Sequence, residues 1–259
     1  MLDAKVISEM LERPLPVTVF DRLESTNITA REIARGDLRE QVIITRTQTG
    51  GRGRLGRSFF SPTGGLYMSL ILRPRVHASE AIKITTTAAV AVARAIDASA
   101  GTRCEIKWVN DVYISGRKVC GILTESKINS DGMLDFAILG IGVNLVPPEG
   151  GFPAEIADRA GAVFDVLHDN ADNLLAAGII NEFLRLYGVA HSRECLDEYR
   201  SRSCVIGREV DVMRVVDGDT TPATAVDIDD EFRLIVRCAD GRTEALGSGE
   251  VSVRAQKAH

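Results

Sequence analysis

The sequence predicts an α+β fold in two parts: a larger part over residues 1–202 and a small all-β part over residues 203–259. Two observations predict this division. Before residue 202, runs of β-branched and apolar residues alternate with segments of helical character. After residue 203, the chain has only short alternating strands separated by turn residues. A chain of 259 residues is long enough for one large and one small domain.

The larger part begins with a predicted strand, "PVTVFDRL", and continues into a predicted helix, "ESTNITAREIARGD", which starts with small polar residues. Two apolar stretches, "QVIITRT" and "LYMSLILRP", predict buried strands on either side of a segment rich in glycine and arginine. Residues 79–100 are rich in alanine and predict a helix that Ser79 caps and Gly101 ends. We expect this helix to pack on the sheet.

The next segment, "CEIKWVNDVYI", predicts a strand and the polar exit from it. "SGRK" predicts a tight turn, and "VCGILTESKI" predicts the returning strand, so the two strands form a hairpin. "MLDFAILGIGVNLV" predicts another apolar strand, and residues 150–200 are expected to be mainly helical. After Arg202 the pattern changes to short strands split by aspartate- and glycine-containing turns, and we place the domain boundary there.

The composition excludes several classes of protein. The net charge of −5 argues against binding of polyanions through bulk charge, so an anion site has to be a local basic patch. No run of 18 apolar residues is long enough to predict a membrane span, and the N-terminus lacks the uncharged core of a signal peptide. The five cysteines are odd in number, widely spaced and without a C-x-x-C motif, which is typical of a protein of the reducing cytoplasm.

The glycine- and arginine-rich segment contains two literal motif matches that its surroundings exclude. Residues 51–56 match the dinucleotide fingerprint G-x-G-x-x-G, and residues 51–58 match a phosphate loop with arginine in place of lysine. Both motifs need a helix directly after the glycines, because its N-terminus binds the phosphate. Pro62 and the two glycines that follow it prevent such a helix. The acidic residue expected about 20 positions later is also missing from residues 70–78.

The same segment still favours anion binding in a more general way. Glycines let backbone N–H groups approach an anion closely, and arginines add bidentate donors. Arg52, Arg54 and Arg57 lie within six residues, and their charges repel one another unless an anion or an acid lies between them. The alternative interpretation is a solvated basic turn.

Two further polar clusters are candidates for ligand contacts. Lys107 lies in an apolar strand, so it is either solvated at the sheet edge or a buried cation that binds an anion. Asn110 and Asp111 follow it, and turn chemistry is the simpler interpretation of this pair taken alone.

The third cluster is Ser25, Thr26 and Asn27, at the start of the first long helix. These residue types predict an N-cap. Their three neutral polar side chains also suit a small neutral polar ligand, and the two roles are compatible.

In this order, the pieces resemble one family over nearly the whole chain, the bacterial biotin protein ligases, also called biotin–acetyl-CoA-carboxylase ligases. The matching motifs are S-T-N at 25–27, the glycine/arginine loop at 48–57, K-W-V-N-D at 107–111, K-x-x-G-I-L-x-E at 118–125 and G-I-G-V-N at 140–144. Val109 stands where the family has proline, and Phe59 stands where some members have tryptophan. About 16 residues precede the first strand, too few for the N-terminal DNA-binding module of some members. The resemblance is therefore to the form that lacks this module.

The resemblance implies a fold related to class II aminoacyl-tRNA synthetases and biotin synthetases, a mixed sheet with flanking helices, plus a small C-terminal Src-homology-3-like β-barrel. It also implies a reaction in two steps. ATP activates biotin to biotinyl-5′-AMP, and biotin then passes to a specific lysine of a biotin carboxyl carrier protein with release of AMP.

Residue chemistry and the resemblance together give the predicted site. Lys107 and Arg54 are the predicted catalytic residues. The predicted biotin-binding residues are Ser25, Thr26, Asn27, Gln48, Arg52, Gly53, Arg54 and Lys107. The predicted nucleotide-binding residues are Arg54, Arg57, Lys107, Asn110 and Asn144. Neutral groups suit the uncharged ureido ring, and cations suit the carboxylate and phosphates. ATP is expected to bring Mg²⁺, mostly bound by water, so no protein ligand of a metal is assigned.

The arginine loop is expected to be a flap that is mobile when empty and orders over the adenylate, which it shields from water. The expected partner is the biotin carboxyl carrier domain of a biotin-dependent carboxylase, with no nucleic acid and no membrane, and the family's sheet edge suggests a homodimer. One alternative function is a lipoate–protein ligase of the same fold. A non-enzymatic alternative is a regulator that binds nucleic acid through the arginine loop, against which the net charge and the lack of a recognition helix count.

Overall fold

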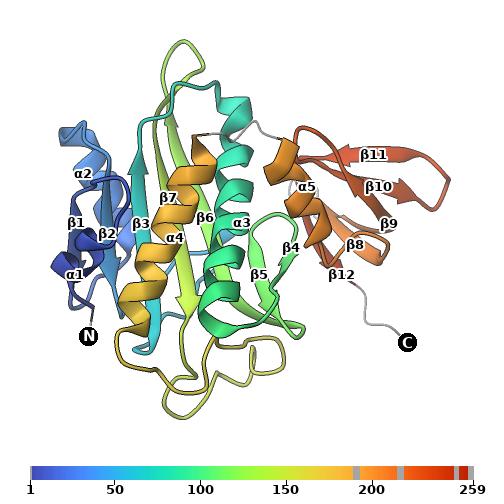
Figure 1. Cartoon of the computed structure of the whole chain (residues 1–259). Helices are drawn as coiled ribbons and strands as arrows, with labels where there is room; N and C mark the ends of the chain where they lie inside the picture. The colour runs from blue at the N-terminus through green and yellow to red at the C-terminus, as the bar shows by residue number, and fades with distance from the viewer. Residues whose placement is uncertain (1, 189–192, 215–218, 248–250, 256–259) are drawn as a thin grey trace.

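The computed structural model describes residues 2–188, 193–214, 219–247 and 251–255. Its centre is a seven-stranded mixed sheet with the strand order β1-β2-β3-β7-β6-β5-β4 (Figure 1). The strands are β1 (Val17–Phe20), β2 (Gln41–Thr45), β3 (Gly65–Leu72), β4 (Glu105–Lys107), β5 (Asp111–Ile114), β6 (Arg117–Ile128) and β7 (Leu134–Asn144). β1 and β2 are parallel, and the other neighbours are antiparallel. The predicted mixed sheet is thereby confirmed.

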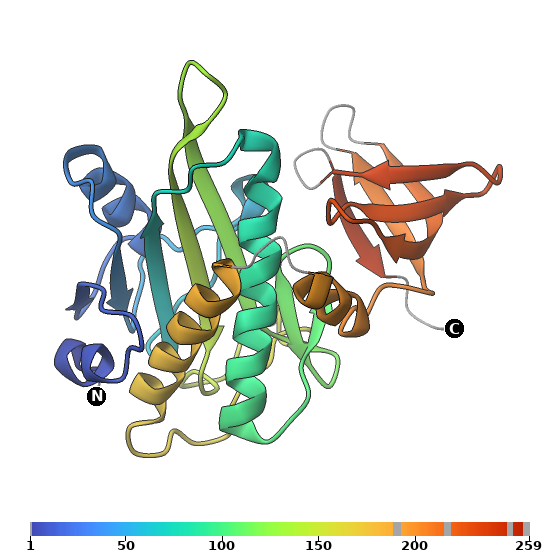
Figure 2. The same cartoon turned by 45° about the horizontal axis from the view of Figure 1, so that its top comes forward.

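Helices cover both faces of this sheet. The helices are α1 (Ala4–Glu9), α2 (Thr26–Gly36), α3 (Ala81–Ala100), α4 (Ala171–Tyr187) and α5 (Arg193–Ser201). α3 and α4 lie side by side on one face, as both views show (Figures 1 and 2). α2 covers the opposite face of the sheet. Two consecutive residues of β6 show this, because side chains that follow one another along a strand point to opposite faces. Thr124 contacts Thr85 of α3 at 2.7 Å between their hydroxyl oxygens, whereas Glu125 contacts α2.

The coverage of both faces explains the composition of the central strands. All residues of β2 and β3 are buried, so these strands are continuous apolar runs rather than alternating ones. α3 is buried along most of its length, and its alanines allow close packing on the sheet. None of the helices in the described ranges is both long enough and apolar enough to cross a membrane.

The second part of the chain forms a five-stranded antiparallel sheet of order β11-β10-β9-β8-β12 (Figure 2). Its strands are β8 (Glu209–Arg214), β9 (Thr220–Ile228), β10 (Leu234–Cys238), β11 (Thr243–Leu246) and β12 (Val251–Ala255). This confirms the predicted small all-β part, while the domain limits at 202 and 203 stay a prediction. Phe232, in the turn between β9 and β10, packs edge to face on Tyr199 of α5 with ring centroids 5.5 Å apart. Trp108 Nε1 donates to the backbone oxygen of Phe232 at 2.9 Å.

Three predictions about elements were wrong. Ser79 does not cap α3, because it lies in a short 3₁₀ turn, η2 (Ala78–Glu80), and its N–H donates to the His77 side chain. The segment predicted as one strand with its exit forms two strands, β4 and β5. The turn that joins them, over residues 108–110, contains no Gly or Pro and so gave no turn signal in the sequence. The mainly helical segment begins only at α4, because two glycines at 150 and 151 with positive φ and a proline at 153 interrupt the chain.

α1 was not predicted at all. It has only six residues, and Asp3 caps it by accepting hydrogen bonds from the backbone N–H groups of Lys5 and Val6. So short a helix carries too little apolar periodicity to be recognised in the sequence.

Candidate active site

A cavity of about 1450 Å³ lies between the N-terminus of α2, the loop from β2 to β3, the hairpins from β4 to β7 and the start of the second sheet. The structure brings together on its wall every residue predicted for the site: Ser25, Thr26, Asn27, Gln48, Arg52, Gly53, Arg54, Arg57, Lys107, Asn110 and Asn144. These residues come from four separate segments, 25–27, 48–57, 107–110 and 144, so their convergence is a result of the fold. The roles assigned to them stay predictions.

The glycine/arginine loop folds back on itself as a narrow hairpin. Three backbone hydrogen bonds cross it: Gln48 N to Ser61 O at 3.0 Å, Phe59 N to Gly51 O at 2.9 Å and Gly53 N to Arg57 O at 2.7 Å. Gly51 is required here, because a Cβ would clash with the Ser61 hydroxyl and the Phe59 carbonyl oxygen. A single 3₁₀ turn, η1 (Arg54–Gly56), forms the tip, and β3 follows. No α-helix follows the glycines within this described loop. The structure therefore confirms the exclusion of both the dinucleotide fingerprint and the phosphate-loop motif.

The three loop arginines differ in their environment. Arg52 and Arg57 are exposed, whereas Arg54 is half-buried and donates to Asn110 Oδ1 at 3.1 Å. Asn110 in turn donates from Nδ2 to the backbone oxygen of Ile122 at 2.9 Å, so it is held in place. Burial lowers the pKa of the Arg54 guanidinium, and the nearby Asp111 carboxylate offsets part of this effect. A partly desolvated cation that donates to a neutral amide is well placed to bind an anion.

The β4–β5 and β5–β6 hairpins supply two lysines to the same end of the cavity. Lys107 is the last residue of β4 and is paired in register with Asp111 of β5. Lys118, at the start of β6, lies with its Nζ 2.7 Å from Asp111 Oδ1 and 5.7 Å from the centre of the Phe59 ring. Lys118 was recognised as part of a motif but not as a residue of the site. The motif K-x-x-G-I-L-x-E was the signal that could have identified it.

Three glycines form the floor of the cavity on β6 and β7. A Cβ on Gly121 would lie 2.8 Å from the Phe59 ring, and one on Gly142 would lie 2.6 Å from it. A Cβ on Gly140 would lie 2.8 Å from Cγ of Asn27 and closer still to its Oδ1. The bare backbone therefore lets Phe59 and Asn27 lie directly on the sheet. In G-I-G-V-N, period-two alternation places both glycines and the asparagine on the cavity face.

The start of α2 is capped from outside the helix. Ser25 occupies the N-cap position but makes no side-chain cap hydrogen bond. Gln48 replaces it, because its Oε1 accepts from Thr26 N at 2.8 Å and from the Thr26 hydroxyl at 3.2 Å. The predicted N-cap position within the cluster is therefore confirmed at Ser25, but the capping hydrogen bond comes from Gln48 instead of the cluster. The Ser25 hydroxyl lines the cavity instead and is available to a ligand.

Asn27 is only 4% exposed, and three hydrogen bonds hold its side chain. Its Nδ2 donates to Glu125 Oε2 at 2.8 Å and, at 3.4 Å, to the backbone oxygen of Leu123. Its Oδ1 accepts from the Ser69 hydroxyl at 2.6 Å. Arg31 forms an ion pair with the second oxygen of Glu125, which orients that carboxylate. One lone pair of Asn27 Oδ1 is left for a ligand N–H, and Gln48 Nε2 has one proton left after it donates to Ser61 at 3.0 Å.

Asn144, at the end of β7, ties the cavity to the irregular segment after this strand. Its Nδ2 donates to the backbone oxygen of Gly161 at 2.9 Å. The backbone N–H of Gly161 in turn donates to the backbone oxygen of Lys118 at 2.9 Å. The Asn144 side chain thus contributes to the wall of the cavity, with its Oδ1 as the group that can meet a ligand.

The sequence and the fold match one family of proteins. Residues 19–144 match the model of the biotin/lipoate A/B protein ligase family, and residues 205–254 match that of the biotin protein ligase C-terminal domain. The biotin–[acetyl-CoA-carboxylase] ligase of Mycobacterium tuberculosis is 30% identical over 253 residues, which cover 92% of this chain and 88% of that protein. The chain belongs to the biotin protein ligase family. The predicted resemblance is thereby confirmed.

Other members of this ligase family match different shares of the chain. The bifunctional ligase/repressor BirA of Bacillus subtilis is 39% identical over 166 residues, which cover 63% of this chain and 50% of that protein. The chain thus spans about half the length of this relative. Among solved structures, the biotin protein ligase from Aquifex aeolicus in complex with biotin and ATP has a TM-score of 0.76 at 23% identity. The match covers 93% of this chain and 99% of the chain in that structure, and it confirms the predicted fold class.

Proposed function

We propose that the chain activates biotin with ATP and transfers it to a lysine of a biotin carboxyl carrier domain. One observation carries this proposal: a single cavity joins a neutral polar cluster at the start of α2 to a cluster of cations on the loop and hairpins. The substrate needs both, because its ureido ring is uncharged while its carboxylate and the ATP phosphates are anionic. The M. tuberculosis relative, which this chain matches over 88% of its length, is named a biotin–[acetyl-CoA-carboxylase] ligase, and this supports the assignment.

The neutral end matches the hydrogen-bonding groups of a ureido ring. Asn27 Oδ1 offers an acceptor, Gln48 Nε2 offers a donor, and the Ser25 hydroxyl offers either. A ureido ring carries N–H donors and one carbonyl acceptor, so this set fits it without burying a charge. Thr26 acts mainly by holding Gln48, since its hydroxyl donates to that side chain.

The cationic end would bring the two anions together. In the first step, a biotin carboxylate oxygen attacks the α-phosphorus, and the bond from that phosphorus to the bridging oxygen breaks to release pyrophosphate. Lys107 would span the carboxylate and the α-phosphate, and Arg54 would bind the phosphate of the adenylate. Arg52 and Gly53 would close over biotin, and Arg57, Asn110 and Asn144 would face the nucleotide. Magnesium would arrive on the ATP phosphates and keep most of its water ligands.

In the second step, the amine of the carrier lysine attacks the biotinyl carbonyl, an amide bond forms, and AMP leaves with the phosphate oxygen. The mixed anhydride would hydrolyse if water reached it between the two steps. The loop is suited to cover it, because its tip carries Arg54 into the cavity while Gln48, on the same loop, holds the start of α2.

The decisive experiment is formation of the adenylate from biotin and α-labelled ATP, followed by transfer to a purified carrier domain. Labelled biotinyl-5′-AMP and release of pyrophosphate support the proposal, whereas no adenylate at saturating biotin and ATP would refute it. The alternative of a lipoate ligase is tested by asking which acid stimulates ATP–pyrophosphate exchange. A gel shift at physiological salt tests the nucleic-acid alternative. A homodimer, to be tested by light scattering with and without biotin, and a cytoplasmic location stay predictions.

A further inference from the structure

Strand β4, which ends at Lys107, has only three residues and lies at the edge of the seven-stranded sheet. It pairs with β5 on one side, so the backbone groups on its outer side need other partners. Two such groups of β4, and two of Cys104 directly before it, are satisfied. Ile106 N donates to Arg202 O at 2.7 Å, and Ile106 O accepts from Cys204 N at 2.9 Å. Cys104 N donates to Asp97 Oδ1 at 2.7 Å, and Cys104 O accepts from Arg202 NH1 at 3.2 Å.

The segment that joins α5 to the second sheet thus continues the catalytic sheet beyond β4. Ser203 forms a parallel bridge with Ile106, and Cys204 reaches the wall of the cavity. Lys107, the last residue of β4, directly follows Ile106 in the chain. Lys107 therefore lies one residue from the hydrogen bonds that join β4 to the segment 202–204.

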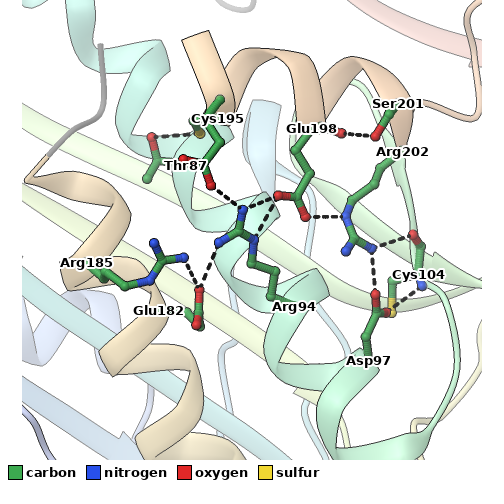
Figure 3. Close-up of polar contacts among 11 residues, drawn as sticks. Thr87, Arg94, Asp97, Cys104, Glu182, Arg185, Cys195, Glu198, Ser201 and Arg202 are labelled. Atoms are coloured by element: carbon green, nitrogen blue, oxygen red, sulfur yellow. Dashed lines mark hydrogen bonds and ion pairs between the residues drawn. The ribbon is translucent and has the colours of Figure 1, made fainter. Parts of the chain in front are cut away.

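Arg202 is the residue that holds this segment (Figure 3). It is only 8% exposed, and its guanidinium lies between Asp97 of α3 at 2.8 Å and Glu198 of α5 at 2.8 Å. Burial disfavours the charged form, but these two carboxylates outweigh it, so the pKa of Arg202 is raised. A buried cation held by two carboxylates and a backbone carbonyl has little freedom, and the loss of one partner is costly.

Arg94 is a natural comparison in the same network. It forms ion pairs with Glu198 and Glu194 of α5 and with Glu182 of α4, and so it ties three helices together (Figure 3). Its described hydrogen bonds and ion pairs go to helices and none goes to β4. The two arginines therefore share Glu198 but differ in whether they touch the strand that carries Lys107.

We propose that Arg202 is a positioning residue for adenylation, which sets the place of Lys107 through the outer edge of β4. The proposal rests on the function proposed above, in which Lys107 bridges the two reacting anions. Helix α2, at whose start the ureido ring would bind, packs on β2, β3 and β7 rather than on β4 at the edge of the sheet, so Arg202 should affect the chemical step more than the affinity for biotin.

The test compares Arg202→Met and Arg202→Lys with Arg94→Met as the matched control. The measurements are the single-turnover adenylation rate at saturating biotin and ATP, the Kd for biotin, the melting temperature and amide hydrogen exchange at Ile106. Misplacement of a catalytic group by about 1 Å costs roughly 100-fold in rate. We expect Arg202→Met to slow adenylation by roughly 10- to 100-fold, to change the Kd for biotin by a much smaller factor and to speed exchange at Ile106. Arg202→Lys should recover part of the rate, and Arg94→Met should lower the melting temperature but keep the rate within about twofold.

Parallel losses of rate and melting temperature in Arg202→Met and Arg94→Met would overturn the proposal, as would a wild-type rate in Arg202→Met. If Arg202→Met does not fold, Asp97→Asn removes one carboxylate partner while Oδ1 can still accept from Cys104 N, and it should slow adenylation in the same direction. A wild-type rate in a folded Asp97→Asn with faster exchange at Ile106 would also overturn it. Failure of the proposed function shows itself differently, as a wild-type protein that forms no biotinyl-5′-AMP.

Discussion

Replacement of Gly140 by alanine tests the glycine floor directly. The new Cβ would lie 2.8 Å from Cγ of Asn27, whereas ordinary contact begins near 3.4 Å, so Asn27 has to move by at least about 0.6 Å. Such a shift stretches the hydrogen bonds of Asn27 to Glu125, now 2.8 Å, and to Ser69, now 2.6 Å. A bond to a charged group contributes about 1.5–3 kcal/mol and a neutral one about 0.5–1.5 kcal/mol. Loss of both hydrogen bonds costs about 2–4.5 kcal/mol.

The assay is calorimetric titration with biotin and, separately, with ATP, beside a thermal melt. At about 2–4 °C per kcal/mol for a protein of this size, we expect the melting temperature to fall by several degrees. Biotin should bind at least about tenfold more weakly, because roughly 1.4 kcal/mol corresponds to a factor of ten, while ATP affinity changes little. Gly178→Ala is the matched control, since its Cβ would lie 3.6 Å from Ala95 in ordinary contact and alanine favours the helix. A Gly140→Ala protein that melts and binds biotin like the wild type would refute the reasoning.

Three further substitutions test other parts of the site. Lys107→Ala should slow single-turnover adenylation by roughly 10²–10³ with an unchanged melting temperature, since its interaction grows as the anions meet; early melting at a near wild-type rate would remove Lys107 from the catalytic set. Arg54→Ala should release biotinyl-5′-AMP into solution about tenfold to a hundredfold more readily, because a charge-assisted contact of about 1.5–3 kcal/mol to the phosphate is lost; equal losses of biotin and adenylate affinity would argue that Arg54 only shapes the loop. Burial raises the pKa of Glu198, but hydrogen bonds from Arg94 and Arg202 outweigh this and hold it below its ordinary value of 4.5. The stability that the Glu198 carboxylate contributes is therefore present above about pH 4.5 and is lost as the pH falls through the lowered pKa. The melting temperatures of wild type and Glu198→Gln should consequently converge on acidification. A difference in melting temperature that stays constant from neutral pH to about pH 3 contradicts this.

Local patterns were sufficient to predict the main strands and the long helices, whereas the residues of the cavity were predicted from residue chemistry together with the family resemblance. In G-I-G-V-N the alternation of β7 already assigns the glycines and Asn144 to one face and Ile141 and Val143 to the other. The β5–β6 hairpin follows from its turn residues in the same way. Such features depend on neighbours within a few positions, which a single sequence contains.

Contacts between distant segments could not be predicted from those patterns. Gln48 replaces Ser25 as the cap of α2 only because the loop folds against the start of the helix, 22 positions away from Thr26. Glu125 orients Asn27 from 98 positions away. The partner of Ile106 at Ser203 is likewise far along the chain, so the extension of the sheet beyond β4 has no local signal. In each case a tertiary contact, rather than a propensity, decides what the side chain does.

The loop joins the two ends of the cavity through its own hydrogen bonds. Its first branch holds the start of α2 through Gln48, and its tip reaches the β4–β5 turn through Arg54 and Asn110. The bond from Arg54 goes to a neutral amide oxygen, whereas a phosphate would offer a charge-assisted bond roughly twice as strong. If a phosphate binds in the cavity as proposed, we expect it to compete with Asn110 for Arg54 and to draw the tip of the loop toward the ligand. Gly51 lets the two branches of the loop lie close together, so under the proposed function we expect such a movement to reach Gln48 and to couple recognition of the acid to that of the nucleotide.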